Sequence, residues 1–220
     1  MKKTICSIVL LLSTLLLTPA TWAVEIRPDT LVEETAQEIL KIIKRDKDTL
    51  SDDKEKILDL VKSKILPHFN FTRMTRLAMG KNWSKASPQQ QQGLEEAFRT
   101  LLVRTYYKAL AVYSDHTIKV SPVKNMAGKT DITVKTEVIP SHGQAISINY
   151  SMEKINSAWK VYDITVAGIS LVINYRGTFN SKIRSGGVKE LLKALNKKNR
   201  AMEEKEKEKN TALTIQFKTT

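Results

Sequence analysis

The spacing of apolar residues changes twice along this 220-residue chain, and no other feature limits its possible folds as strongly. Between residues 31 and 113 apolar residues recur every three or four positions, which is the period of an α-helix. Between 118 and 166 they alternate with polar residues, which is the period of a strand with one buried face. After Gly168 the helical period returns. Because helices and strands are segregated along the chain, the pattern predicts an α+β domain with an antiparallel sheet of about four to five strands.

The helical half of the pattern has one clearly marked helix start. Three helices are expected before the sheet, over 31–43, 57–65 and 88–113. The third begins most clearly, because Ser87 can cap it, Pro88 suits its first position and Gln90 can close a capping box. Apolar residues cover more than one stripe of this third helix, which indicates that it is buried on more than one side.

The alternating half of the pattern is divided by short polar segments. Four strands are expected, over 118–121, 131–138, 146–153 and 159–166. Turn residues separate them at 125–128, 141–143 and 156–157, as in hairpins. The last run has apolar residues on both faces, and this predicts a strand in the middle of the sheet.

The first 23 residues have the composition of a cleavable signal peptide. Lys2 and Lys3 precede an apolar run over 5–17, and Ala23 follows at a position that signal peptidase accepts. At about 1.5 Å per residue the run spans about 20 Å, whereas the hydrocarbon core of a bilayer is roughly 30 Å thick. A cleaved peptide is therefore favoured over an uncleaved anchor. Cys6 lies near the start of the apolar run and not at its end, which argues against a lipidated N-terminus, so we expect export to the periplasm.

The C-terminal part returns to helix and then becomes almost purely charged. Helical segments are expected over 174–184 and 188–195, and Ser185-Gly186-Gly187 between them is interpreted as a helix stop and restart rather than an anion site. The charged run over 197–209 favours a disordered tail over a solvated helix. The predicted division is a signal peptide over 1–23, one α+β domain over 24–199 and a tail over 200–220.

Charge and reactive residues exclude several classes of function. Lys and Arg total 36 and Asp and Glu 23, so the formal charge of +13 favours anionic partners. The basic residues are interleaved with acids and aromatic residues make up only 6%, so no nucleic acid is expected as a partner. One cysteine and three scattered histidines predict no metal site, and no cofactor motif is present.

An enzyme has little support from the residues. Asp163 with Tyr162 or Tyr175 offers an acid beside an aromatic hydroxyl, which suits proton abstraction. Neighbouring residues of a strand point to opposite faces, so Asp163 and Tyr162 are not expected to share one site. We favour a strand-edge aspartate with packing tyrosines, and we predict no catalytic residue.

The segment from Trp159 to Phe179 carries the most specific motifs of the chain. It contains Tyr162-Asp163, Gly168-Ile169-Ser170-Leu171, Asn174-Tyr175-Arg176 and Phe179. In this order they resemble the signature of the MlaC family, also called the toluene-tolerance family, of periplasmic phospholipid-binding proteins. Elements earlier in the chain resemble the family in the expected order, namely Ile65-Leu66-Pro67-His68-Phe69, Leu77–Gly80, Trp83, Ser87-Pro88, Phe98-Arg99 and Tyr106. The resemblance covers about residues 30 to 199 and leaves out the charged tail.

This resemblance implies a nuclear-transport-factor-like cone, in which helices wrap a curved sheet and a phospholipid is held as ligand between them. It also implies a carrier that exchanges lipid with two partners, an outer-membrane lipoprotein–porin complex and an inner-membrane ABC transporter. Such a carrier serves as the substrate-binding component of the transporter and maintains the lipid asymmetry of the outer membrane.

Apolar residues near the signature and on the third helix are the candidates for the lipid pocket. We expect it to be lined by Phe98, Leu101, Leu102, Tyr106, Ile148, Tyr150, Val161, Ile169, Leu171, Val172 and Phe179. Arg104 and Arg176 are the candidates for contact with the phosphate of the head group.

Two other interpretations stay open at this stage. A helix with a wide apolar face and apolar strand faces can enclose either a cavity or a close-packed core. A cavity with a buried acid or histidine would fit a cone-fold enzyme that acts on a hydrophobic small molecule. A filled core would fit a non-catalytic envelope protein that acts only through its surface.

Overall fold

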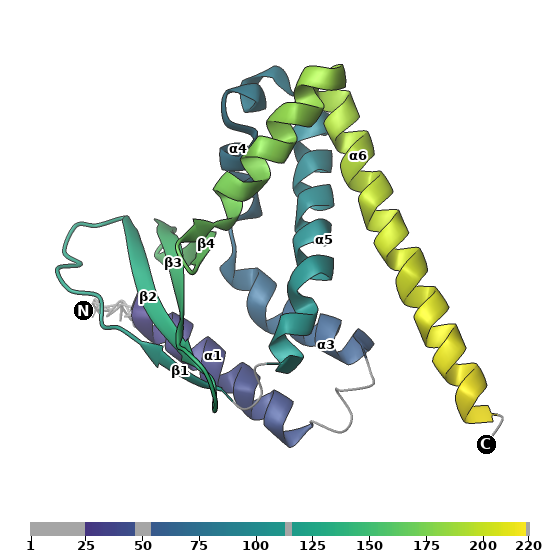
Figure 1. Cartoon of the computed structure of the whole chain (residues 1–220). Coiled ribbons are helices and arrows are strands. Elements are labelled where there is room, and N and C mark those ends of the chain that lie inside the picture. Colours follow the sequence, from purple (N-terminus) through teal and green to yellow (C-terminus); the bar gives the residue numbers. More distant parts are fainter. Residues whose placement is uncertain (1–24, 47–53, 113–115, 219–220) are drawn as a thin grey trace, which may run out of the picture.

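The helices and strands predicted from the two periods are present in a computed structural model, which describes residues 25–46, 54–112 and 116–218 (Figure 1). The helices before the sheet are α1 (Pro28–Arg45), α3 (Lys54–Leu60), the π-helical turn η1 (Val61–Ile65), the 3₁₀ turn η2 (Leu66–His68), α4 (Phe71–Met79), the 3₁₀ segment η3 (Gly80–Lys85) and α5 (Pro88–Val112). The strands and the last helix are β1 (Thr117–Val120), β2 (Asp131–Ile139), β3 (Ile146–Ile155), β4 (Ala158–Val166), β5 (Ile169–Ser170) and α6 (Leu171–Lys218). The predicted α+β class, with a curved antiparallel sheet and surrounding helices, is confirmed. The predicted signal peptide lies outside the described residues.

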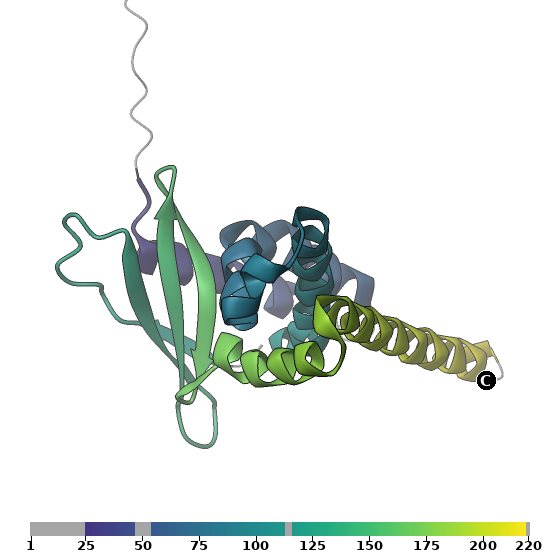
Figure 2. The ribbon, with the colours of Figure 1, turned by 90° about the horizontal axis from the view of Figure 1, so that it is seen from above.

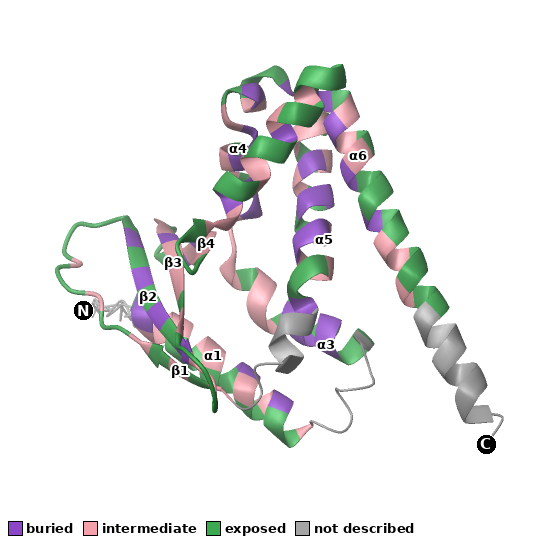
Figure 3. Ribbon diagram, viewed as in Figure 1, coloured by how far each residue is buried: buried purple, intermediate pink, exposed green. Residues whose placement is uncertain are grey.

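The sheet has one apolar face, and α1 packs against it. Its strands follow the order β1-β2-β3-β4-β5, and every neighbouring pair is antiparallel. Figure 3 shows buried and exposed residues alternating along β2, as the period of two requires. The buried set is Ile132, Val134, Thr136 and Val138. Leu31 and Val32 of α1 contact the apolar residues of this face. Among the described residues, no helix combines the length and the apolar character needed to cross a bilayer.

The position of β4 differs from the prediction. The next strand, β5, has only two residues and pairs only with Thr165 and Val166, so most of β4 lies at an edge of the sheet. The prediction of a central strand was therefore wrong. Apolar residues occur on both faces of β4 because helices cover its second face, and not because strands border it along both edges. Tyr162, for example, packs against the apolar cluster that α4, α5 and α6 form.

Helices α4, α5 and α6 form a layer beside the β4 edge (Figure 2). The capping box predicted for α5 is confirmed, because the backbone N–H of Gln90 donates to Ser87 Oγ (3.2 Å) and the backbone N–H of Ser87 donates to Gln90 Oε1 (2.9 Å). Helix α4 was not among the predicted helices. Asn70 gave a signal for it, since its side chain caps the helix by accepting from the N–H of Arg73 (2.9 Å).

Helix α6 is interrupted at the glycine pair. Gly186 and Gly187 have non-helical dihedral angles, and Gly187 has a φ of 71°, which favours a residue without a side chain. The predicted helix stop and restart is confirmed. The second half of α6 then runs back along α5, where Asn199 Nδ2 donates to the carbonyl oxygen of Ala97 (2.8 Å).

The charged C-terminal segment is helical in the structure, not disordered as predicted. The backbone of α6 continues to Lys218, far beyond the predicted end of the domain at residue 199. Arg104 on α5 pairs with Glu206 (2.6 Å) and with Glu203 (3.2 Å), and Lys207 pairs with Glu203 one turn away (3.0 Å). The charge run alone predicted a solvated tail, because the sequence pattern does not reveal that an arginine about one hundred residues earlier lies opposite the glutamates.

Candidate functional site

The apolar residues of the described chain form three clusters instead of one. The helical cluster joins α4, α5 and α6 through Phe71, Met74, Ala78, Met79, Ala86, Leu94, Ala97, Phe98, Leu101, Leu102, Val172, Phe179, Val188, Leu191 and Leu195. The α1–α3 cluster contains Ile39, Ile43, Ile57, Leu58, Leu60, Val61 and Tyr107. The sheet cluster contains Ile132, Val134, Met152, Trp159 and Val161. Because a domain usually has one contiguous core, three clusters mean that the sheet and the helices present separate apolar surfaces.

The segment around Leu66-Pro67-His68-Phe69 connects these clusters. Leu66 packs against both the helical cluster and the α1–α3 cluster, and Phe69 packs against both the helical cluster and the sheet cluster. The backbone also joins β4 here, because the N–H of Asn70 donates to the carbonyl oxygen of Val161 (2.8 Å). This upstream motif, which is separate from the signature segment, therefore lies where the three apolar surfaces meet.

The residues predicted for the lipid pocket are divided among these surfaces. Phe98, Leu101, Leu102, Val172 and Phe179 are buried in the helical cluster, and Leu171 is half-buried against it. Val161 belongs to the sheet cluster, Tyr150 packs against that cluster, and Ile148 is half-buried one position along the same face. Tyr106 and Ile169 are exposed, by 44% and 66%. These residues therefore lie in separate groups in the structure. That they line one pocket together stays a prediction.

Two grooves in the described part of the chain lie elsewhere. One, of about 550 Å³, is lined by Phe69, Phe71 and Lys160, and the other, of about 510 Å³, lies between α3, α5 and the second half of α6. Leu66 and Arg99 border both grooves. None of the eleven predicted pocket residues lines either of them.

The two arginines predicted to meet a phosphate have other partners. Arg104 pairs with Glu203 and Glu206 and lines the second groove. Arg176 on α6 donates from Nε (2.9 Å) and Nη2 (2.7 Å) to the carbonyl oxygen of Leu77 near the end of α4. To contact a head group, either guanidinium would have to give up bonds that it already makes. Breaking them has a cost in free energy, because a buried acceptor would be left without its donor.

Asp163 of the signature caps the first turn of α6. Its Oδ1 accepts from the backbone N–H of Val172 (3.0 Å), and its Oδ2 accepts from Ser170 Oγ (2.5 Å). Ser170 Oγ in turn accepts from the N–H of Ile173 (3.1 Å). A carboxylate at the start of a helix satisfies free N–H groups and interacts favourably with the helix dipole. The signature pair Asp163 and Ser170 therefore fixes the point where β4 ends and α6 begins.

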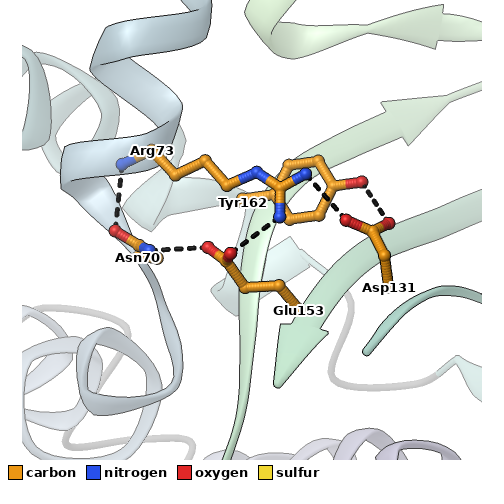
Figure 4. Close-up of polar contacts among 5 residues, drawn as sticks. All are labelled: Asn70, Arg73, Asp131, Glu153 and Tyr162. Atoms are coloured by element: carbon orange, nitrogen blue, oxygen red, sulfur yellow. Dashed lines mark hydrogen bonds and ion pairs between the residues drawn. The ribbon is translucent and has the colours of Figure 1, made fainter. Parts of the chain in front are cut away.

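Tyr162, the other half of the signature pair, belongs to a polar cluster between α4 and the sheet (Figure 4). The guanidinium carbon of Arg73 on α4 lies over the Tyr162 ring, 3.6 Å from its centroid, and the guanidinium donates to Asp131 (2.7 Å) and to Glu153 (2.7 Å). The Tyr162 hydroxyl donates to Asp131 (2.7 Å), and Asn70 Nδ2 donates to Glu153 (2.6 Å). The cluster is not predictable from the sequence pattern, because its members lie at the start of one helix and on three strands.

The expectation that Tyr162 and Asp163 point to opposite faces is wrong, because β4 contains a β-bulge. Met152 pairs with Val161 and Ser151 pairs with Asp163, so Tyr162 is an extra residue in the strand. A bulge re-aims side chains, and both signature residues face the helical layer. They still do not form an acid–hydroxyl pair, since Asp163 caps α6 and the Tyr162 hydroxyl bonds to Asp131.

Burial raises the pKa of several tyrosines in these regions. The pKa of Tyr162 rises to about 12 through burial and its bond to Asp131, and that of Tyr107 to about 12 through burial and the charge of Glu206. The pKa of Tyr175 also rises to about 12, through burial and the neighbouring Tyr106. Within the described residues, no group of three or more His, Cys, Asp or Glu side chains is arranged to hold a metal ion.

These pKa shifts predict a loss of stability at alkaline pH. In the unfolded chain tyrosines ionise near pH 10, whereas in the folded chain these three stay protonated to about 12. The unfolded state therefore releases protons first. The contribution of these three tyrosines to the free energy of unfolding is fully present below about pH 10 and is lost as the pH rises toward 12. Ultraviolet titration should show a set of tyrosines that ionise well above pH 10. The Tyr162→Phe variant should contain one fewer of these late-ionising tyrosines. Ionisation of every tyrosine together near pH 10 in the folded protein would contradict this.

Comparison with known proteins agrees with the resemblance seen in the sequence. The family model described as MlaC protein matches residues 33–197. A curated relative from Haemophilus influenzae, named intermembrane phospholipid transport system binding protein MlaC, is 24% identical over 165 residues, covering 72% of this chain and 77% of the relative. Toluene tolerance protein ttg2D from Pseudomonas putida is 28% identical over 161 residues, covering 73% of this chain and 74% of the relative.

A solved structure is similar over most of this fold. It is the phospholipid-binding protein from Ralstonia solanacearum, determined in complex with a phospholipid, and it superposes with a TM-score of 0.74 at 35% sequence identity. The similarity covers 80% of this chain and 99% of that one. Since the family model also spans more than half of the sequence, this chain belongs to the MlaC family.

Proposed function

We propose that this protein is a periplasmic phospholipid carrier that holds the acyl chains of its ligand between the sheet and the helices. The observation that carries the proposal is the similarity, at 35% identity, to a protein whose structure contains a phospholipid. The three separate apolar surfaces support it, because a ligand between them would complete a core that the chain alone leaves divided. The carrier needs no catalytic step and no cofactor.

The free energy of exposing a lipid to water explains why a carrier is needed. Burying about 30 methylene groups of two acyl chains is worth on the order of 20 kcal/mol relative to water. A phospholipid therefore does not cross an aqueous compartment at a useful rate on its own. A protein that buries the chains as a bilayer does makes the transfer nearly neutral in free energy, so contact with a membrane complex suffices for exchange.

The partners belong to the same proposal. We infer that the carrier exchanges lipid between an outer-membrane lipoprotein–porin complex and an inner-membrane ABC transporter, and so maintains the lipid asymmetry of the outer membrane. The name of the Haemophilus influenzae relative, which places it in an intermembrane phospholipid transport system, supports this assignment. Export by a signal peptide over 1–23 would place the carrier in the periplasm.

Organic extraction of the purified protein followed by lipid mass spectrometry tests the proposal. We expect close to one phospholipid per chain, with little preference among head groups, because the acyl-chain contribution exceeds that of any polar contact. The intact mass of the exported protein should correspond to a chain that begins at Val24. Protein that is lipid-free when purified, and stays so after incubation with phospholipid vesicles, would refute the carrier function.

A further inference from the structure

The signature residues of this chain make polar links between elements and do not form a polar pocket. The first link joins β4 to α6, because Asp163 accepts from the N–H of Val172 and from Ser170 Oγ. It sets the residue at which α6 begins. The side chains that follow, Leu171, Val172 and Phe179, all pack in the helical cluster.

The second link joins α6 to α4. Both donors of Arg176 that face α4, Nε and Nη2, are bonded to the carbonyl oxygen of Leu77, in the last turn of that helix. Terminal carbonyl oxygens of a helix have no partner within the helix, so a guanidinium is well suited to hold them. One turn further along α6, Asn180 Oδ1 accepts from Asn82 Nδ2 (2.9 Å), which ties α6 to η3, the segment that follows α4.

The third link joins α4 back to the sheet. Arg73 contacts three strands at once, through Asp131 of β2, Glu153 of β3 and the Tyr162 ring of β4 (Figure 4). Its side chain is 30% exposed and that of Glu153 is 19% exposed, so the contact is partly shielded from solvent. A planar guanidinium can stack on a ring and bond two carboxylates at the same time, which an ammonium group cannot do.

Together the links form a closed circuit from sheet to α6, from α6 to α4 and from α4 to sheet. We propose that Arg73, Asp163 and Arg176 are positioning residues for lipid binding, which hold the helical cluster at a fixed distance from the apolar face of the sheet without touching the ligand. This inference rests on the proposed carrier function. The supporting geometry is that Arg73 lies on the polar face of the sheet, whereas Val161 belongs to the sheet cluster on the other face and Tyr150 packs against it.

Arg73→Leu tests the positioning role, with Arg45→Leu as the matched control. Arg45 makes an exposed ion pair with Asp46 that links no two elements of the circuit. Lipid per chain is measured by mass spectrometry after equilibration with vesicles of phosphatidylethanolamine and phosphatidylglycerol, and folding is measured by circular dichroism. We expect Arg73→Leu to fold and its lipid per chain to fall by about threefold or more. Arg45→Leu should hold as much lipid as the wild type. Equal lipid content in Arg73→Leu and the wild type would overturn the inference.

Two further variants separate positioning from general stability. Arg73→Lys keeps the charge but loses the planar contact, so an intermediate lipid content is expected, and this variant decides the matter if Arg73→Leu does not fold. Leu191→Ala removes packing from the second half of α6, outside the circuit. If it lowers lipid content as much as Arg73→Lys for the same fall in Tm, stability alone explains the effect and positioning is refuted. A wild-type chain without lipid would refute the carrier function itself, whereas wild-type lipid content in every Arg73 variant would refute only the positioning role.

Discussion

Replacing Leu171 with glutamate is expected to remove bound lipid while leaving the fold largely intact. Leu171 is the first residue of α6 and lies half-buried at the margin of the helical cluster. A carboxylate placed against acyl chains without a partner costs several kcal/mol, so the lipid content should fall by about tenfold or more. The fold should lose only about 1 kcal/mol, because the side chain is partly exposed and a negative charge is favourable at a helix N-terminus.

Ile173→Glu is the matched control for this substitution. Ile173 lies in the same first turn but is 57% exposed, and its position two residues later puts it on a different face of α6. It should keep its lipid as the wild type does. Lipid content and circular dichroism of both variants check the prediction. If Leu171→Glu unfolds, or keeps a normal amount of lipid, Leu171 is not part of the pocket.

The helices and strands followed from the sequence because each has a local signal. The alternation in β2 and the capping box of Ser87 and Gln90 depend only on residues a few positions apart. The edge position of β4 and the helical C-terminal segment were missed for a different reason. Both depend on contacts with residues far away in the chain, the helices beside β4 in one case and Arg104 in the other.

The candidate site was predictable in composition but not in geometry. The signature identified Tyr162, Asp163 and Arg176 as important, but not what each side chain touches. A bulge of one residue in β4 put Tyr162 and Asp163 on the same side, where strand alternation predicted opposite sides, and no feature of the sequence there marks a bulge. Arg73 was missed because a lone arginine on a short helix resembles any solvated surface charge until the carboxylates of two strands are placed opposite it.

Asp163→Ala is expected to have the largest effect on stability among substitutions of the signature. It removes the acceptor for the N–H of Val172 and for Ser170 Oγ, and it removes a negative charge from the start of α6. A lost cap costs about 1–2 kcal/mol, and a part-buried donor left without its partner costs about 1–3 kcal/mol. We therefore expect the free energy of unfolding to fall by about 3 kcal/mol, with a drop in Tm of roughly 6–12 °C for a chain of this size.

Asp163→Asn distinguishes the cap from the charge. Its amide oxygen can still accept from the N–H of Val172, but the amide has no charge and only one acceptor oxygen, so Ser170 Oγ loses a carboxylate partner. A loss of about 1 kcal/mol is expected, because hydrogen bonds to an ionised acceptor are roughly twice as strong as neutral ones. Thermal denaturation followed by circular dichroism gives both values. Equal losses for the two variants would mean that the charge of Asp163 matters and its hydrogen-bond geometry does not. No loss in either would mean that α6 begins where it does for reasons of packing alone.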